Sequence, residues 1–258
     1  FSQDSAMRPG MTLKSVGITG FALAHSSSGW FSTKGAGLVP MDGTEGEPIG
    51  KSQGLASDWV EAFWLFLDPK DQREKILVGT PEGLSLVEGR GVVEKNVFPY
   101  PETWITGVVL GKTTVESEIE STDSLSSFIG KGKVIYVGTK SSGLWRFAEG
   151  GWVSLTAENP NFPLKNVNRL YHLGTRIFVC TNEGLVIFSE NIFGYDEFRY
   201  KGFGIKNYKT IYPFPTITSI QKIVCSDDFW VASNGGLARY IRRKSLSDSI
   251  YADNLDNT

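Results

Sequence analysis

Residues Lys133–Phe147 read KVIYVGTKSSGLWRF, and this stretch decides the fold because similar stretches recur along the chain. Bulky apolar residues lead into a small residue and a threonine, and a short polar turn, a glycine and a leucine follow. Four more copies lie at Trp30–Met41, Leu77–Val87, Phe178–Phe188 and Trp230–Tyr240. The chain is therefore organised as five similar units.

The Thr or Ser of each copy gives the period of the repeat. These residues are Thr33, Thr80, Thr139, Thr181 and Ser233, at intervals of 47, 59, 42 and 52 residues. Units of this length, with short runs of β-branched and aromatic residues between Gly, Asn and Pro, are typical of propeller blades and lack helical periodicity. The sequence predicts an all-β fold, a β-propeller of four-stranded antiparallel blades with five detectable repeats, as a single domain over residues 1–258.

Each copy predicts a β-hairpin that supplies the second and third strands of a blade. The residue before the Thr or Ser is always small, which predicts close approach of a neighbouring sheet. A glycine closes the turn, where a tight hairpin needs positive φ. The small residues are Ser32, Gly79, Gly138, Cys180 and Ala232, and the turn glycines are Gly37, Gly83, Gly143, Gly184 and Gly236.

An apolar run before each hairpin predicts the first, innermost strand of the blade. These runs are Gly17–His25, Asp58–Leu67, Thr103–Leu110, Asn166–Leu173 and Ile217–Cys225. Fourth strands are predicted at Val92–Phe98 and Gly151–Thr156. Because a closed ring leaves no open sheet edge, we expect the five blades to close within this chain. The alternative is that the chain is a fragment of a longer propeller or of a multidomain protein.

The hairpin with its proline-containing lead-in resembles the two-component regulator propeller repeat. Residues Pro163–Phe188 and Thr216–Tyr240 carry the resemblance best, and Val134–Phe147 follows closely. Cys180 and Ala232 depart from the glycine of the family pattern. The resemblance implies a periplasmic sensor ectodomain or a surface or secretion-associated protein of a bacterium. The chain begins at Phe1 rather than Met, so we expect a mature protein or a fragment from which a signal peptide has been removed. The matching positions are structural, so the resemblance concerns the fold more than the function.

Two segments interrupt the repeat. Residues Lys112–Lys131 are rich in Ser, Thr and acidic residues, which predicts a solvated, mobile loop. Residues Asn191–Phe214 alternate aromatic with polar and basic residues, a composition that suits either an outer strand or the core of an interface. The candidate binding residues within this second segment are Tyr195, Phe198, Arg199, Tyr200, Phe203, Tyr208 and Tyr212.

Composition and motifs argue against several functions. A net charge of −2 predicts no nucleic-acid partner, and no apolar run reaches the roughly 20 residues of a transmembrane segment. Cys180 and Cys225 are predicted to be buried free thiols rather than a disulfide. No catalytic, metal-binding or cofactor-binding motif is present. We therefore expect a non-catalytic, exported binding module without cofactor or metal, which recognises a protein partner or a saccharide-like ligand.

Two alternatives remain open. His25 and His172 lie on predicted inner strands, so one of them could serve a propeller lyase or hydrolase in the central channel. The chain could also be a structural scaffold subunit of an envelope assembly, which a large apolar patch on one blade would favour.

Overall fold

The structure is a computed structural model of the chain. It describes residues 17–23, 29–41, 47–68, 71–100, 102–112, 124–130, 132–148, 151–156, 165–173, 176–182, 184–189, 217–222, 229–233 and 236–240. Within these ranges the fold is all-β, with one short α-helix and one 3-10 turn. The chain divides into two compact units, Phe1–Val108 with Ser121–Lys131 and Val109–Glu120 with Gly132–Thr258. Each unit is described separately.

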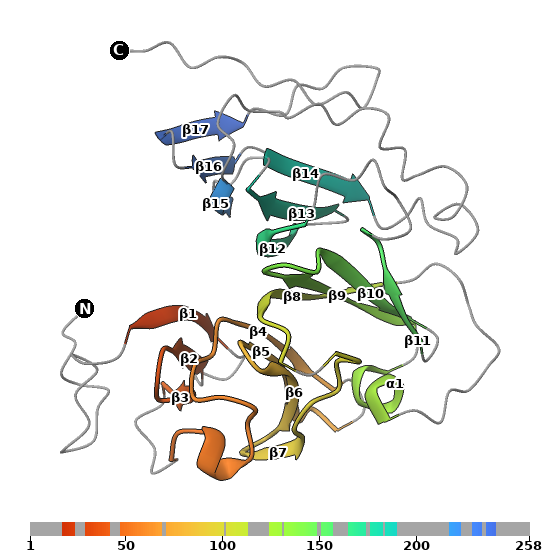
Figure 1. The fold of residues 1–258 in the computed structure, drawn as a ribbon. Coiled ribbons are helices and arrows are strands. Elements are labelled where there is room, and N and C mark those ends of the chain that lie inside the picture. Colours follow the sequence, from red (N-terminus) through yellow and green to blue (C-terminus); the bar gives the residue numbers. More distant parts are fainter. Residues whose placement is uncertain are drawn as a thin grey trace. The chain divides into compact units, whose positions relative to one another are not determined.

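The first unit contains two antiparallel sheets whose strands follow the order of the chain (Figure 1). One sheet is β1 (Ile18–Leu23), β2 (Gly29–Thr33) and β3 (Leu38–Pro40); the other is β4 (Ala62–Leu67), β5 (Glu74–Thr80), β6 (Gly83–Glu88) and β7 (Gly91–Glu94). The 3-10 turn η2 (Lys51–Gln53) lies between the sheets in the sequence, and helix α1 (Ser124–Ile129) also belongs to this unit.

The second unit contains sheets of the same design. One sheet is β8 (Ile105–Lys112), β9 (Lys133–Thr139), β10 (Leu144–Ala148) and β11 (Gly151–Ser154), and the division between the units falls within β8. The next sheet is β12 (Val167–Leu173), β13 (Arg176–Thr181) and β14 (Gly184–Ser189). The last is β15 (Ile217–Lys222), β16 (Phe229–Ser233) and β17 (Gly236–Tyr240).

The strands confirm the all-β class and the prediction that each repeat is one strand followed by a hairpin. In every sheet the strands pair antiparallel in chain order. The predicted fourth strands are present as β7 and β11. The other three sheets contain three strands among the described residues, so the four-stranded form holds for two of the five.

At two of its five positions, the small residue of the repeat lies where the first strand of the next sheet approaches, as the sequence predicts. A Cβ placed on Gly79 of β5 would lie 2.5 Å from Ile105 Cγ2 and 3.2 Å from Val108 Cγ2. A Cβ on Gly138 of β9 would in the same way meet the side chain of Val167. No larger side chain fits at these two positions without movement of the neighbouring strand.

The hairpin turns depend on a threonine as well as on glycine. Gly37, Gly83 and Gly143 have φ of 72°, 125° and 77°, which favours glycine. The Thr139 hydroxyl donates to the carbonyl of Gly143 at 2.9 Å and accepts the amide of Ser142 at 2.9 Å. Thr33 and Thr80 bridge their own turns in the same way. The recurring threonine therefore satisfies buried polar groups of the turn.

The core of the first unit lies between its two sheets. Its buried members come from both sheets and from the connection between them: Trp30, Leu38, Ile49, Leu55, Val60, Ile76, Val78 and Val87. Phe63, Leu65 and Val92 pack against this cluster. The inward alternation of apolar residues on β5 and β6 builds the core from the second sheet.

Helix α1 corrects one prediction. Residues Lys112–Lys131 were expected to form a solvated, mobile loop, but residues Ser124–Ile129 form a helix whose Leu125, Phe128 and Ile129 are buried. These three residues lie at i, i+3 and i+4, so they share one helix face. The Phe128 ring packs edge-on against Phe66 of β4, with 5.9 Å between centroids.

The cysteine prediction is confirmed for the cysteine that the structure describes. Cys180 is a free, fully buried thiol on β13, at the small-residue position of its repeat. Burial raises the pKa of its thiol well above the ordinary value, because the charged thiolate would be desolvated. Cys225 lies outside the described residues.

Candidate functional site

In the first unit, the β2–β3 turn of one sheet is hydrogen-bonded to the connection that leads into β4 of the other sheet. The β2–β3 turn is joined to the connection before β4, since the amides of Gly35 and Gly37 both donate to the carbonyl of Asp58, at 3.0 and 2.8 Å. The amide of Val60 then donates to the carbonyl of Thr33 at 2.8 Å. These bonds fix the backbone of residues 58–60 beside the turn and set the direction of the side chains there.

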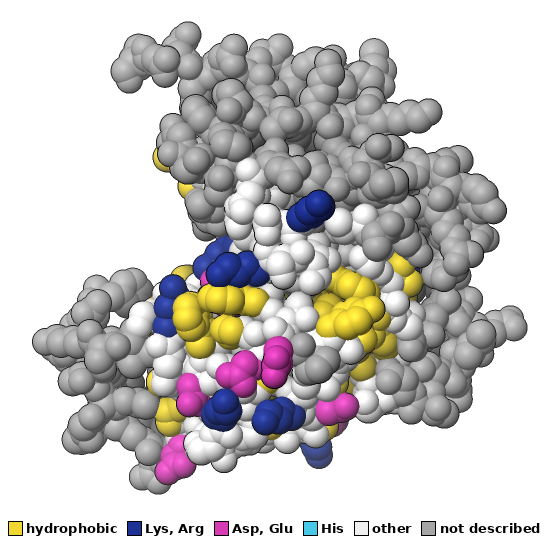
Figure 2. Space-filling view, viewed as in Figure 1, with side chains coloured by type: hydrophobic (Ala, Val, Ile, Leu, Met, Phe, Trp, Pro, Cys, Tyr) yellow, Lys and Arg dark blue, Asp and Glu magenta, His cyan; other side chains and the backbone are white. Residues whose placement is uncertain are grey.

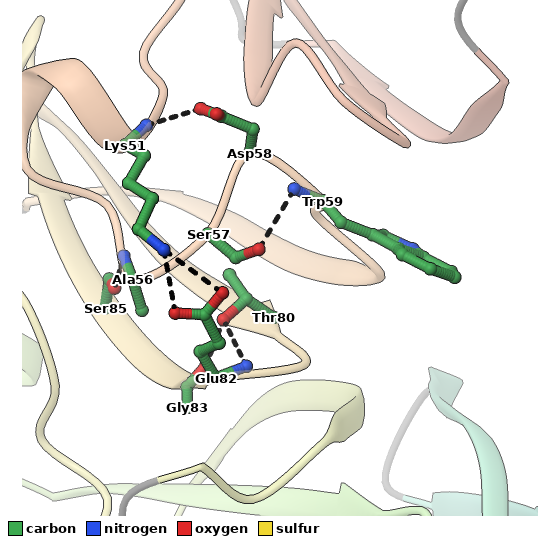
Figure 3. Close-up of polar contacts among 9 residues, drawn as sticks. All are labelled: Lys51, Ala56, Ser57, Asp58, Trp59, Thr80, Glu82, Gly83 and Ser85. Atoms are coloured by element: carbon green, nitrogen blue, oxygen red, sulfur yellow. Dashed lines mark hydrogen bonds and ion pairs between the residues drawn. The ribbon is translucent and has the colours of Figure 1, made fainter.

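A cluster of polar side chains lies next to this connection (Figure 3). The Asp58 carboxylate accepts the backbone amide of Lys51 at 2.5 Å. The Lys51 ammonium pairs with the Glu82 carboxylate of the β5–β6 turn at 3.2 Å, and both side chains are about half exposed. The exposed Lys51–Glu82 pair contributes little stability. It places one charge of each sign at the surface.

The Trp59 ring extends away from the polar cluster (Figure 3). The Lys34 ammonium lies over this ring, 5.0 Å from its centroid. The indole N–H of Trp59 donates to Glu61 Oε2 at 2.8 Å, and the Trp104 ring meets Trp59 in a T-shaped contact, with 5.0 Å between centroids. We call Lys34, Trp59, Glu61 and Trp104 the tryptophan edge. Lys34 is exposed, and the other three are half-buried.

The tryptophan edge offers two aromatic rings beside an ammonium and a carboxylate. Such a set can stack on an apolar ligand face and hydrogen-bond its polar rim. Tyr100, four residues before Trp104 in the sequence, is 53 % exposed and packs edge-on against Phe98, with 6.1 Å between ring centroids. On the side of the molecule drawn in Figure 2, acidic and basic side chains of the described residues lie among hydrophobic ones. The chemistry therefore suits a neutral, amphipathic ligand surface.

The sequence-predicted binding residues Tyr195, Phe198, Arg199, Tyr200, Phe203, Tyr208 and Tyr212 lie outside the described residues. His25 also lies outside them. His172 is half-buried on β12, where it pairs with Ile177 of β13. The described part of the chain contains no group of three or more His, Cys, Asp and Glu side chains placed to hold a metal ion.

The tryptophan edge was not predicted from the sequence, although the positions of its two tryptophans in the repeat are unusual. Trp59 and Trp104 each stand directly before the first buried residue of an inner strand segment, Val60 and Ile105. The same position carries Gly17, Asn166 and Thr216 in the other repeats. A large aromatic residue at a position that the repeat does not require would have marked this edge.

No helix in the described ranges is long and apolar enough to cross a membrane. No protein-family model matches the sequence. No curated protein matches it either.

The fold is similar to that of the extracellular domain of BT4673 from B. thetaiotaomicron in two crystal structures. One structure describes BT4673 as a proposed one-component system, and the other as a proposed hybrid two-component system. The identity is 14 % and the TM-score 0.56 in both comparisons. The matches cover 88 % and 92 % of this chain, but only 26 % and 28 % of the BT4673 chains. This chain therefore spans about a quarter of their length, and the likeness concerns the fold.

Proposed function

We propose that this chain forms blades of a β-propeller that acts as a non-catalytic, exported binding module for a protein partner or a saccharide-like ligand. The tryptophan edge is the observation that carries the proposal. The repeated residues have structural tasks in the hairpins and between the sheets, which leaves the connections for recognition. The similarity to an extracellular domain supports export to the periplasm or the cell surface.

A saccharide suits the chemistry of this edge. A sugar ring has an apolar C–H face that can stack on indole, and hydroxyl groups at its rim that can bond to Glu61 and Lys34. The aromatic segment Asn191–Phe214, with Tyr195, Phe198, Arg199, Tyr200, Phe203, Tyr208 and Tyr212, is proposed to contribute further contacts. A protein partner is the second candidate, favoured by the exposure of Tyr100 and by the two tryptophans of the edge, because Trp and Tyr are enriched in interface hot spots.

The test titrates the chain with a panel of linear neutral hexasaccharides and follows tryptophan fluorescence and calorimetric heat. We expect Trp59→Ala and Trp104→Ala each to weaken binding about tenfold or more, in line with the loss of an aromatic contact. Trp152→Ala is the matched control, because Trp152 packs on Phe147 in the second unit and should not affect affinity.

Equal affinity in all four proteins would show that the tryptophan edge is not the site. If no saccharide binds, the protein partner is tested with a photo-reactive amino acid at position 100. A specific cross-linked partner that is lost with Trp59→Ala would then support the second candidate.

A further inference from the structure

Inner strands place two apolar residues against the preceding sheet. On β8 these residues are Ile105 and Val108, which lie against the small residue Gly79 of β5. They are 0 % and 3 % exposed. The junction between consecutive sheets therefore joins an inner strand to the small-residue face of the sheet before it.

The second unit repeats this junction. Val167 and Leu170 of β12 lie against Gly138 of β9 and are 1 % and 8 % exposed. Val167 pairs with Thr181, and Leu170 with Val179, on either side of a register shift in β12. These register positions identify the equivalent residues in the other sheets.

The equivalent residues of β1 are exposed. Ile18 pairs with Thr33 and Phe21 with Phe31, again on either side of a register shift. Ile18 is 51 % exposed, Phe21 68 % and the neighbouring Leu23 66 %. The first sheet thus presents the apolar side of a junction that β8 and β12 bury. We call Ile18, Phe21 and Leu23 the leading face.

The last sheet presents the opposite side of the same junction. Its small residue is Ala232 on β16, which pairs with Leu237 of β17. Leu237 is 59 % exposed, and Trp230, two residues before Ala232 on the same face of the strand, is 37 % exposed. Val231, on the other face, is 1 % exposed. We call Trp230, Ala232 and Leu237 the trailing face.

We propose that the leading face of one copy of this chain packs on the trailing face of a second copy, head to tail. The second copy is the partner because it presents the small-residue face that an inner strand requires. The interface would continue the junction already formed at Gly79 and Gly138. Two different faces then meet, so the association is heterologous, and large exposed apolar side chains on both faces become buried.

The test measures the mass of the chain in solution by sedimentation equilibrium over a range of concentrations. We expect the mass of the wild type to rise above that of the monomer with concentration. The variants Phe21→Asp/Leu23→Asp and Trp230→Asp/Leu237→Asp should each remain monomeric alone. Their equimolar mixture should form dimers, because one variant retains the trailing face and the other the leading face.

Val93→Asp is the matched control, since Val93 is 57 % exposed on β7 but lies on neither face, and it should associate like the wild type. The milder variants Phe21→Ser and Trp230→Ser repeat the test if an aspartate variant loses its circular-dichroism spectrum. A wild type that stays monomeric at all concentrations would overturn the proposal. A mixture of the two variants that stays monomeric would also overturn it. If the wild type is monomeric and both face variants destabilise it equally, the last sheet of the same chain covers the leading face.

Discussion

At the scale of single residues, the repeated threonine is the clearest case of a residue whose task is structural. Thr139 is fully buried, and its hydroxyl both donates and accepts within the β9–β10 turn. The polar groups it serves are the Gly143 carbonyl and the Ser142 amide. Because unsatisfied buried groups are costly, this one hydroxyl stabilises the turn more than its size suggests.

Thr139→Val should lower the free energy of unfolding by about 0.5–1.5 kcal/mol, because the isosteric valine removes both hydrogen bonds of the hydroxyl, while the Gly143 carbonyl still accepts the amide of Thr139. Thr139→Ser retains the hydroxyl and should cost less. Urea denaturation of the three proteins measures the effect. A valine variant as stable as the wild type would mean that the hydroxyl does not hold the turn.

Sequence reasoning identified the small residues and the turn glycines because each has one physical requirement that recurs in every copy. Gly79 has no room for a side chain, and Gly83 has positive φ. Trp59 and Trp104 were not identified, because they stand at positions that the repeat does not require and so have no periodic signal. Their contact depends on how two connections far apart in the sequence come together.

At the scale of elements, helix α1 shows how a buried cation can fix a short segment. Six residues are too few for a stable isolated helix. The Lys75 ammonium of β5 donates to the Phe128 carbonyl at 3.0 Å, near the helix C-terminus, where a positive charge is favourable. The same ammonium pairs with Asp68 at 2.7 Å and lies 5.0 Å from the centroid of the Phe128 ring.

Lys75→Met should release α1 while the β5–β6 hairpin stays folded. We expect amide hydrogens of residues 125–130 to exchange about tenfold faster, since the C-terminal cation is lost and the helix depends on docking. Hydrogen exchange followed by mass spectrometry measures this. Lys51→Met is the control, because Lys51 forms only an exposed ion pair with Glu82, and it should leave α1 unchanged. Unchanged exchange in Lys75→Met would contradict this role for Lys75.

The strands were predictable from the sequence, and α1 was missed for a physical reason. Inner strands and hairpins carry runs of β-branched and aromatic residues between turn residues, which is a strong local signal. The helix has only Leu125, Phe128 and Ile129 as its apolar face, followed by Gly130, within a segment rich in Ser and acidic residues. That composition indicates a solvated loop, and Lys75, the residue that favours a helix, lies 53 residues from Phe128 in the sequence.

At the scale of the whole molecule, the repeat dictates the sheets and their order but not how the series of sheets ends. The hairpin pattern is the same in an open series and in a closed ring, so periodicity cannot distinguish them. What distinguishes them is whether Ile18 and Phe21 are covered, and that depends on a surface far away in the sequence or in another molecule. The expectation of a ring closed within this chain therefore stays a prediction.

In a chain of repeated sheets, each sheet contacts mainly its neighbours, so we expect a destabilising substitution in one sheet to affect mainly the neighbouring sheets. Gly79→Val places a side chain against Ile105, and Gly138→Val places one against Val167. Each should lower the free energy of unfolding by about 1–3 kcal/mol through overpacking. Hydrogen exchange should rise most in the sheets of β5 and β8 for Gly79→Val and in the sheets of β9 and β12 for Gly138→Val. Gly91→Ala, whose Cβ would meet only a carbonyl at 4.0 Å, is the control. Equal acceleration in all the described sheets by either valine would contradict local coupling.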